Sequence, residues 1–238
     1  MATGPAWPRR PTGATVNRTT STAPHTGMPR HGRRGPAYRS RGGWQHGHVR
    51  MFAAVVPPEH ALDDLEEFLG PRREAGPGLR WTARDQWHLT VAFMPAVPER
   101  AVDDLLERMA RAAARRTPFA ATLTGAGAFP DPARAKVLWA GVGGLEPEVE
   151  LSRLAVGARA AAAKAGADVE GRRFHPHLTL ARVGRPAEVT RWLRVLETYR
   201  GPGWTASELV LVESHLGEGP QRRPRYEVVE TFALGARR

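Results

Sequence analysis

Two tetrapeptides of the same form, His88-Leu89-Thr90-Val91 and His177-Leu178-Thr179-Leu180, stand far apart in the chain. In each of them a histidine and a threonine are two positions apart, with an aliphatic residue between them. Side chains alternate between the two faces of a β-strand, so the histidine and the threonine of each motif would share one face. The matched pair therefore predicts two strands that direct two histidines and two hydroxyl groups at one substrate.

Such a set of side chains suits the hydrolysis of a phosphodiester without a metal ion. One group must take a proton from the attacking water and another must give a proton to the departing oxygen, roughly in line across phosphorus. Histidine suits both tasks, because its ordinary pKa of about 6.5 lets the neutral and protonated forms coexist near neutrality. The threonine hydroxyls can donate hydrogen bonds to the phosphate oxygens.

The composition excludes several other kinds of chemistry. The chain has 238 residues and no cysteine, which rules out disulfides, thiolate zinc sites and a cysteine nucleophile. No apolar run approaches the roughly 18 residues that a membrane span needs, and no apolar segment follows Arg9-Arg10 as a secretory signal requires. The absence of cysteine fits a reducing compartment, and we expect the cytoplasm.

The formal net charge of +11 is concentrated at one end of the chain. Residues 1–50 hold nine arginines and no acidic residue, whereas the remainder carries 26 basic and 24 acidic side chains. Residues 1–48 are rich in Pro, Gly, Thr, Ser and Arg and lack hydrophobic periodicity, which predicts a disordered tail before a folded domain at 49–238. The tail has three interpretations: a solvated or wrongly assigned extension, which we favour, a nonspecific RNA-binding arm, or an organelle-targeting peptide.

Hydrophobic periodicity predicts an α+β chain from Met51 onward. The expected elements are a strand at 52–56, a helix at 61–69 ended by Gly70-Pro71, a short extended segment at 80–82, the first motif strand at 88–94 and a helix opened by Pro98. They continue with strands at 119–123 and 137–142 joined by a long turn, a helix at 146–165, the second motif strand at 174–183, a helix at 189–196, and strands at 208–213 and 226–234. This order suggests two similar lobes that each contribute one motif strand.

With these motifs the chain resembles the two-histidine phosphoesterases, and among them the bacterial RNA 2′,3′-cyclic phosphodiesterases, formerly called 2′-5′ RNA ligases. The resemblance runs from about Arg50 to Leu234. Its segments are Phe52-Ala53-Ala54-Val55, Trp87-His88-Leu89-Thr90-Val91, Gly127-Ala128-Phe129-Pro130, Val137-Leu138-Trp139 and Pro176-His177-Leu178-Thr179-Leu180-Ala181-Arg182. It implies a bilobal fold in which two pseudo-symmetric lobes of antiparallel sheet, with outer helices, surround a central cleft. It also implies a monomeric hydrolase that opens the 2′,3′-cyclic phosphate end of RNA to a 2′-phosphate without metal or cofactor.

The resemblance assigns a role to each motif residue. His88 corresponds to the proton donor and His177 to the proton acceptor, while Thr90 and Thr179 would hold the phosphate. Arg182 matches an arginine that the family often has five residues beyond its second histidine, where it contacts phosphate. Strand alternation places an offset of five on the opposite face, so Arg182 can reach the site only if a β-bulge or the strand end redirects it.

The same residues admit other interpretations. His175-Pro176-His177 and His46-Gly47-His48 have the His-x-His form of metal ligands, but no cysteine or carboxylate stands at a suggestive spacing, so we expect no metal. The aromatic residues Trp81, Trp87, Trp139 and Phe174 could stack on RNA bases, but their apolar strand contexts favour core packing. The alternatives to an RNA hydrolase are a noncatalytic RNA-end binding module, or the same hydrolase acting on a small cyclic nucleotide.

Overall fold

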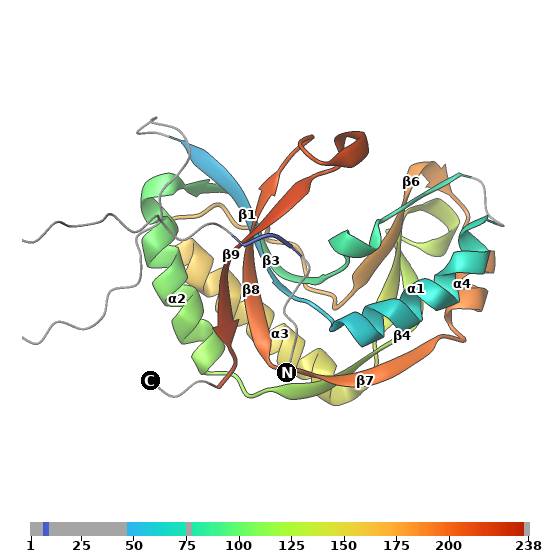
Figure 1. Cartoon of the computed structure of the whole chain (residues 1–238), viewed down its shortest axis with the longest axis horizontal. Helices are drawn as coiled ribbons and strands as arrows, with labels where there is room; N and C mark the ends of the chain where they lie inside the picture. The colour runs from blue at the N-terminus through green and yellow to red at the C-terminus, as the bar shows by residue number, and fades with distance from the viewer. Residues whose placement is uncertain (1–6, 10–46, 75–77, 236–238) are drawn as a thin grey trace, which may run out of the picture.

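The computed structural model of the chain describes residues 7–9, 47–74 and 78–235 (Figure 1). Most of the expected tail at 1–48, including His46, lies outside the described residues. The part of it that is described comprises residues 7–9, 47 and 48. The folded domain expected from residue 49 begins within a strand that starts at His48.

Nine antiparallel strands of the described chain form one curved sheet in the order β7-β4-β5-β6-β3-β1-β8-β9, with β2 paired to β6. The strands are β1 His48–Val55, β2 Leu79–Trp81, β3 Leu89–Pro98, β4 Phe119–Phe129, β5 Ala135–Val142, β6 Leu178–Ala187, β7 Arg200–Ala206, β8 Glu208–His215 and β9 Arg225–Ala233. The two motif strands, β3 and β6, are neighbours at the centre of this order. One lobe consists of β3, β1, β8 and β9, and the other of β6, β5, β4 and β7, which confirms the expected bilobal α+β fold.

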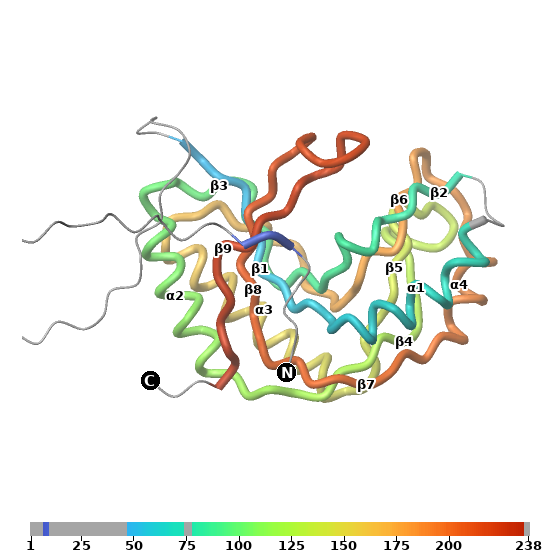
Figure 2. The backbone as a smooth tube through the Cα atoms, in the orientation of Figure 1, coloured from blue at the N-terminus to red at the C-terminus, as the bar shows by residue number. Residues whose placement is uncertain are grey.

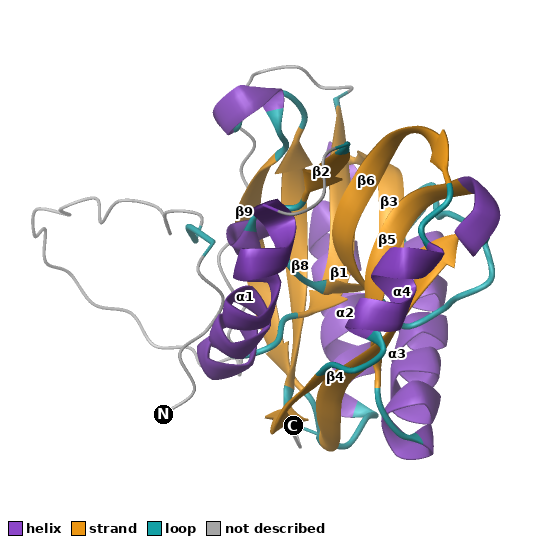
Figure 3. Ribbon diagram, turned by 90° about the vertical axis from the view of Figure 1, so that its right-hand side faces the viewer, coloured by secondary structure: helices purple, strands orange, loops and turns teal. Residues whose placement is uncertain are grey.

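Four α-helices of the described chain cover the lobes: α1 Glu59–Glu74, α2 Val102–Ala114, α3 Leu145–Lys164 and α4 Thr190–Leu196. Helices α2 and α3 pack against each other, and they contact β9 and β3 respectively. Helix α1 contacts β7 and α4 contacts β4, so these two helices belong to the other lobe (Figure 3). The buried residues of α2 recur on one face, as its amphipathic pattern predicts; they are Val102, Leu105, Met109 and Ala113.

The first helix does not end at Gly70-Pro71 as the sequence pattern suggested. Helix α1 continues through both residues to Glu74. A proline inside a helix removes one backbone hydrogen bond, here the one that the carbonyl oxygen of Glu67 would accept, while the Arg72 guanidinium donates to the next carbonyl oxygen, that of Phe68. The buried side chain of Leu69 also fixes this turn against the core, so tertiary packing outweighs the local helix-breaking signal.

The strands around the expected long turn are also longer and more numerous than predicted. Strand β4 runs through Gly125 and Gly127 to Phe129 instead of ending near residue 123. Strand β7 was not predicted, because its segment Arg200-Gly201-Pro202-Gly203 carries the residues of a turn. It is a terminal strand of the sheet and pairs with β4 only. The missing N–H of a proline is tolerated there, because no second strand needs that hydrogen bond.

Candidate active site

The two motifs meet where β3 and β6 pair. Leu89 and Leu178, the central residues of the two motifs, lie opposite each other in an antiparallel bridge. Antiparallel partners step in opposite directions, so one residue away from this bridge His88 comes beside Thr179, and the other motif histidine comes beside Thr90. Both leucines are buried, so the histidines and threonines face the other side of the sheet. The fold thus brings together the four motif side chains that the sequence singled out.

Each motif strand carries a β-bulge directly after its threonine. On β3, the pairing passes from Thr90 to Ala92 while β1 advances by a single residue. On β6, the pairing passes from Thr179 to Ala181 while β5 advances by a single residue. The alternation is therefore reset at the same place in both lobes, and two consecutive side chains of each strand are buried. These buried pairs are Val91-Ala92 and Leu180-Ala181.

The bulge on β6 places Arg182 on the same face as the motif side chains. Arg182 lies opposite Val137 of β5, and Thr179 lies opposite Trp139. Val137 and Trp139 are two residues apart and share a face, so their partners share that face as well. The positive charge of Arg182 is close enough to lower the pKa of both motif histidines. The condition that the sequence set for Arg182 to join the site is met by this bulge.

Both motif histidines are oriented by a backbone carbonyl two residues upstream. The Nδ1 atom of His88 lies 2.8 Å from the carbonyl oxygen of Gln86, and Nδ1 of His177 lies 2.7 Å from that of His175. A carbonyl oxygen only accepts hydrogen bonds, so Nδ1 carries the proton when the ring is neutral. The Nε2 atom of each neutral ring is then left as a proton acceptor.

The surroundings favour the neutral form of both rings. Burial lowers the pKa of His88 from its ordinary 6.5 to about 4; the carbonyl of Gln86 opposes this shift, and the charges of His177 and Arg182 add to it. The pKa of His177 is also lowered, first by burial and further by the charges of His175 and Arg182, against the opposing effect of its carbonyl partner. An anionic substrate would offset the repulsion between these positive charges and help one ring to hold a proton.

Aromatic rings enclose the histidines, and sequence reasoning missed most of them. The ring of Phe52 on β1 stacks on His88 with centroids 4.5 Å apart, and the ring of Tyr226 on β9 meets His88 edge-on at 5.6 Å. In the other lobe, Phe129 meets His177 edge-on at 5.0 Å.

The prediction that the tryptophans are core residues is wrong for Trp139. Its ring centroid lies 4.6 Å from that of His175 and 6.2 Å from that of His177, and its side chain is only half-buried. Trp87, by contrast, is fully buried and confirms the prediction of core packing. The sequence contains one signal for the position of the Trp139 ring: Gly127 lies opposite it on the adjacent strand and has no side chain, which leaves room for the indole.

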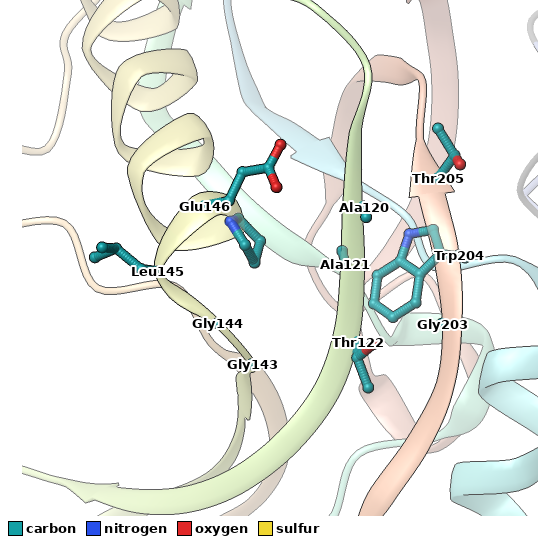
Figure 4. A pocket seen from close by; sticks show the side chains of 11 residues that line it. Ala120, Ala121, Thr122, Gly143, Gly144, Leu145, Glu146, Gly203, Trp204 and Thr205 are labelled. Atoms are coloured by element: carbon teal, nitrogen blue, oxygen red, sulfur yellow. The ribbon is translucent and has the colours of Figure 1, made fainter.

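No group of three or more metal-ligating side chains lies together within the described parts of the chain. A hollow of about 510 Å³ lies between β4, β7 and the start of α3, away from the motifs (Figure 4). Its lining includes Glu146, Thr122, Trp204 and Thr205 but no histidine, so it offers no acid–base pair. None of the helices in the described residues is sufficiently long and apolar to cross a membrane.

Paired His-x-Thr strands at the centre of a bilobal antiparallel sheet define a two-histidine phosphoesterase. The family described as the 2′-5′ RNA ligase superfamily matches residues 56–218. The chain therefore belongs to the 2′-5′ RNA ligase superfamily.

Individual relatives cover most of the folded domain. The RNA 2′,3′-cyclic phosphodiesterase of Escherichia coli is 33% identical over 194 residues, which cover 78% of this chain and 96% of that protein. The protein of the same name from Thermus thermophilus is 33% identical, with 78% of this chain and 90% of the relative covered. The longer relative from Geobacillus stearothermophilus is 28% identical over 77% of this chain, and the match spans 56% of its length. The crystal structure of E. coli LigT in its apo form superposes with a TM-score of 0.61 at 27% identity, covering 79% of this chain and 99% of LigT.

Proposed function

We propose that this protein is an RNA 2′,3′-cyclic phosphodiesterase, a hydrolase that opens the cyclic phosphate at an RNA end to a 2′-phosphomonoester. The observation that carries the proposal is the bridge between Leu89 and Leu178, which brings the two motifs side by side. An acid–base pair is the feature that hydrolysis needs and that binding alone does not. The printed names of the E. coli and T. thermophilus relatives support this substrate class.

In the proposed reaction, Nε2 of His177 accepts a proton from water as the water oxygen forms a bond to phosphorus. The bond between phosphorus and the ribose O3′ breaks, and His88 donates its proton to that oxygen. His177 takes up one proton and His88 releases one, so the net charge of the protein is unchanged, but the two rings have exchanged protonation states and must exchange them back before the next turnover. The donor and acceptor labels follow the family assignment, because both neutral rings present the same Nε2 atom.

The hydroxyl groups of Thr90 and Thr179 and the guanidinium of Arg182 would hold the nonbridging phosphate oxygens. Hydroxyl and guanidinium groups are donors, and a guanidinium also compensates negative charge. A cyclic phosphodiester carries one negative charge, and the Arg182 guanidinium and one imidazolium place two positive charges beside it, so charge compensation needs no metal ion. Solved structures of the related E. coli LigT include complexes with 3′-AMP and with phosphate, which supports a site for this kind of group. We extend the proposal to a monomeric protein of the cytoplasm, consistent with a chain that has no cysteine.

The decisive test is an assay of the full chain in EDTA. An RNA oligonucleotide that ends in a 2′,3′-cyclic phosphate should be converted to a 2′-phosphate end, and a cyclic mononucleotide should be tested beside it. Turnover of the mononucleotide alone would move the substrate class to small cyclic nucleotides. Binding of the RNA without turnover, or turnover only with added metal, would contradict the mechanism.

Substitution of the motif histidines tests the assignment of the site. His88→Ala and His177→Ala should each lower kcat by about 10²- to 10⁴-fold, the usual contribution of a positioned acid or base. His60→Ala on the exposed surface of α1 is the matched control and should retain the wild-type rate. A motif variant that folds normally and keeps its full rate would remove that histidine from the mechanism.

A further inference from the structure

Residues 7–9 cross the sheet of the lobe formed by β3, β1, β8 and β9, on the face that carries His88 (Figure 2). That face carries an apolar cluster separate from the main core, formed by Trp7, Phe52, Ala54, Val210, Val212 and Val228. Trp7 is only 7% exposed, although it precedes the folded domain by about forty residues of sequence. The indole therefore covers an apolar surface that the folded domain itself leaves uncovered.

Polar contacts hold this segment on both sides of the covered face. The amide of Val228 on β9 donates to the carbonyl oxygen of Pro8 at 3.0 Å, and Arg9 forms a parallel bridge with the same residue. On the other side, the indole N–H of Trp7 donates to the carbonyl oxygen of Asp85. Asp85 belongs to the short 3₁₀-helix Arg84–Gln86, which also supplies the carbonyl that orients His88.

Trp7 lies directly against the proposed catalytic ring. Its centroid is 5.5 Å from that of His88, 6.0 Å from that of Phe52 and 5.4 Å from that of Tyr226, all in edge-to-face geometry. Ala54 lies opposite Thr90 in the sheet, and Phe52 is two residues away on the same face. A substrate phosphate held by Thr90 and reached by His88 must approach along this face, where the indole now lies.

We propose that residues 7–9 are an intramolecular strap that occupies the His88 side of the site, and that the RNA end must displace Trp7 to reach that histidine. The identity of the displacing ligand rests on the proposed function, whereas the strap itself rests on the contacts above. Only molecules with the strap undocked can bind substrate at His88. The apparent Kd is therefore the intrinsic Kd divided by the undocked fraction. A partner or an RNA strand that draws the N-terminal segment away would activate the protein.

The strap can be tested without reference to catalysis. Diethyl pyrocarbonate modifies unprotonated imidazole nitrogens, and peptide mass spectrometry of the full chain gives separate rates for His88 and His177. His177 is the internal control, because its neighbouring rings are Phe129 and Trp139 and not Trp7. Trp7→Ala should raise the modification rate of His88 relative to His177 by roughly three- to tenfold, the range that one aromatic contact contributes to an equilibrium.

The same variants should change the kinetics in a defined direction. Trp7→Ala, and a deletion of residues 2–9, should raise kcat/KM for a cyclic mononucleotide by a similar factor while kcat changes little. Trp7→Phe retains a ring at this position and should stay within about twofold of wild type. Circular dichroism and thermal melting would verify that the folded domain is intact in each variant.

The outcomes separate the strap from the proposed function. An unchanged ratio of His88 to His177 modification in Trp7→Ala overturns the strap. A fall in kcat/KM overturns it as well, because Trp7 would then help to bind substrate. If no variant hydrolyses any cyclic phosphate but the modification ratio rises as expected, the strap is upheld and the proposed function fails.

Discussion

At the scale of single residues, the two histidines are prepared in the same way although they come from different lobes. Each donates Nδ1–H to a carbonyl two residues upstream, and each is packed against an aromatic ring. This arrangement fixes the tautomer and leaves Nε2 of each neutral ring as the proton acceptor. Burial is the first cause of the lowered pKa at both rings, and the carbonyl contact opposes it.

The lowered pKa values predict the pH dependence. The charged groups that act on the rings are Arg182 and His177 at His88, and Arg182 and His175 at His177, and each of them lowers the pKa, whereas the carbonyls of Gln86 and His175 raise it. Catalysis needs one neutral and one protonated ring, so kcat/KM should reach its maximum below pH 6.5 and fall as the pH rises and the acid loses its proton. The bound phosphate raises both pKa values, so the alkaline limb of kcat should lie at higher pH than that of kcat/KM. Coincident limbs in the two pH–rate profiles would contradict this prediction.

Spacing alone was sufficient to identify the motif residues, but not their neighbours. A histidine and a threonine two positions apart define one face of a strand in any register. The contacts of Phe52 and Tyr226 with His88 depend instead on which strands become neighbours of β3, and no local pattern specifies that. Arg182 could be predicted only in part. The sequence showed that a bulge was needed to bring it to the site face, but the consecutive apolar residues Leu180-Ala181 did not by themselves locate that bulge.

At the scale of elements, the bulges determine what each strand presents to the site beyond its threonine. Arg182 is on the site face because the bulge on β6 adds one residue before it. Arg182→Met should lower kcat/KM by about tenfold or more, the loss of one charge-assisted contact to phosphate. It should also shift the kcat/KM profile to higher pH, because the charge that lowers both histidine pKa values is gone.

Arg185→Met supplies the matched control for this change, because Arg185 is exposed on the same strand as Arg182 is, whereas the charges that lower the pKa of His88 and of His177 include Arg182 and not Arg185. It should leave both the rate and the pH profile close to wild type. A profile of Arg182→Met that does not move would mean that the guanidinium does not face the histidines in solution.

The close approach of β4 to β5 is a second feature of the elements with a measurable consequence. A Cβ atom at Gly127 would lie 2.0 Å from Cζ2 of Trp139, so the indole must move if any side chain is introduced there. Gly127→Ala should destabilise the fold by about 1–3 kcal/mol, as overpacking does, and lower kcat because Trp139 packs against His175 and His177. Gly184→Ala on β6, where a Cβ meets nothing within 4 Å, is the control. Thermal melts and initial rates would check both effects, and an unchanged Gly127→Ala protein would contradict the tight packing.

The order of elements was largely predictable, whereas their ends were not. Hydrophobic periodicity located the two motif strands and the helices. The apolar residues of a helix or strand repeat at a fixed spacing that does not depend on which elements it packs against. Helix α1 passed through Gly70-Pro71, and β4 passed through Gly125, because the packing of a neighbouring layer outweighed local turn signals. Strand β7 was not predicted because glycine and proline are typical of turns. They are tolerated in β7 because it pairs with one strand only, at the end of the sheet.

At the scale of the whole molecule, the distribution of charge bears on how the substrate is held. Residues 51–238 carry 26 basic and 24 acidic side chains, so the folded part is nearly neutral. Many of its charges are paired on the surface, for example Arg84 with Glu59 and Arg225 with Glu218. Attraction of a phosphate to the site must therefore come from local groups and not from a broad positive field.

This balance predicts a weak salt dependence for a substrate too short to reach the N-terminal segment. Each phosphate charge that is neutralised by a cation contributes about −0.7 to −0.9 to the slope of log affinity against log salt concentration. If Arg182 is the one cation that binds the phosphate, as proposed, log(kcat/KM) for a cyclic mononucleotide should fall with a slope of about −1 or shallower. Arg182→Met should flatten the slope further, whereas Arg185→Met should leave it unchanged. A slope of roughly −3 or steeper with the full chain would require several more cations at the phosphate, and would bring the arginines of residues 1–50 into the site.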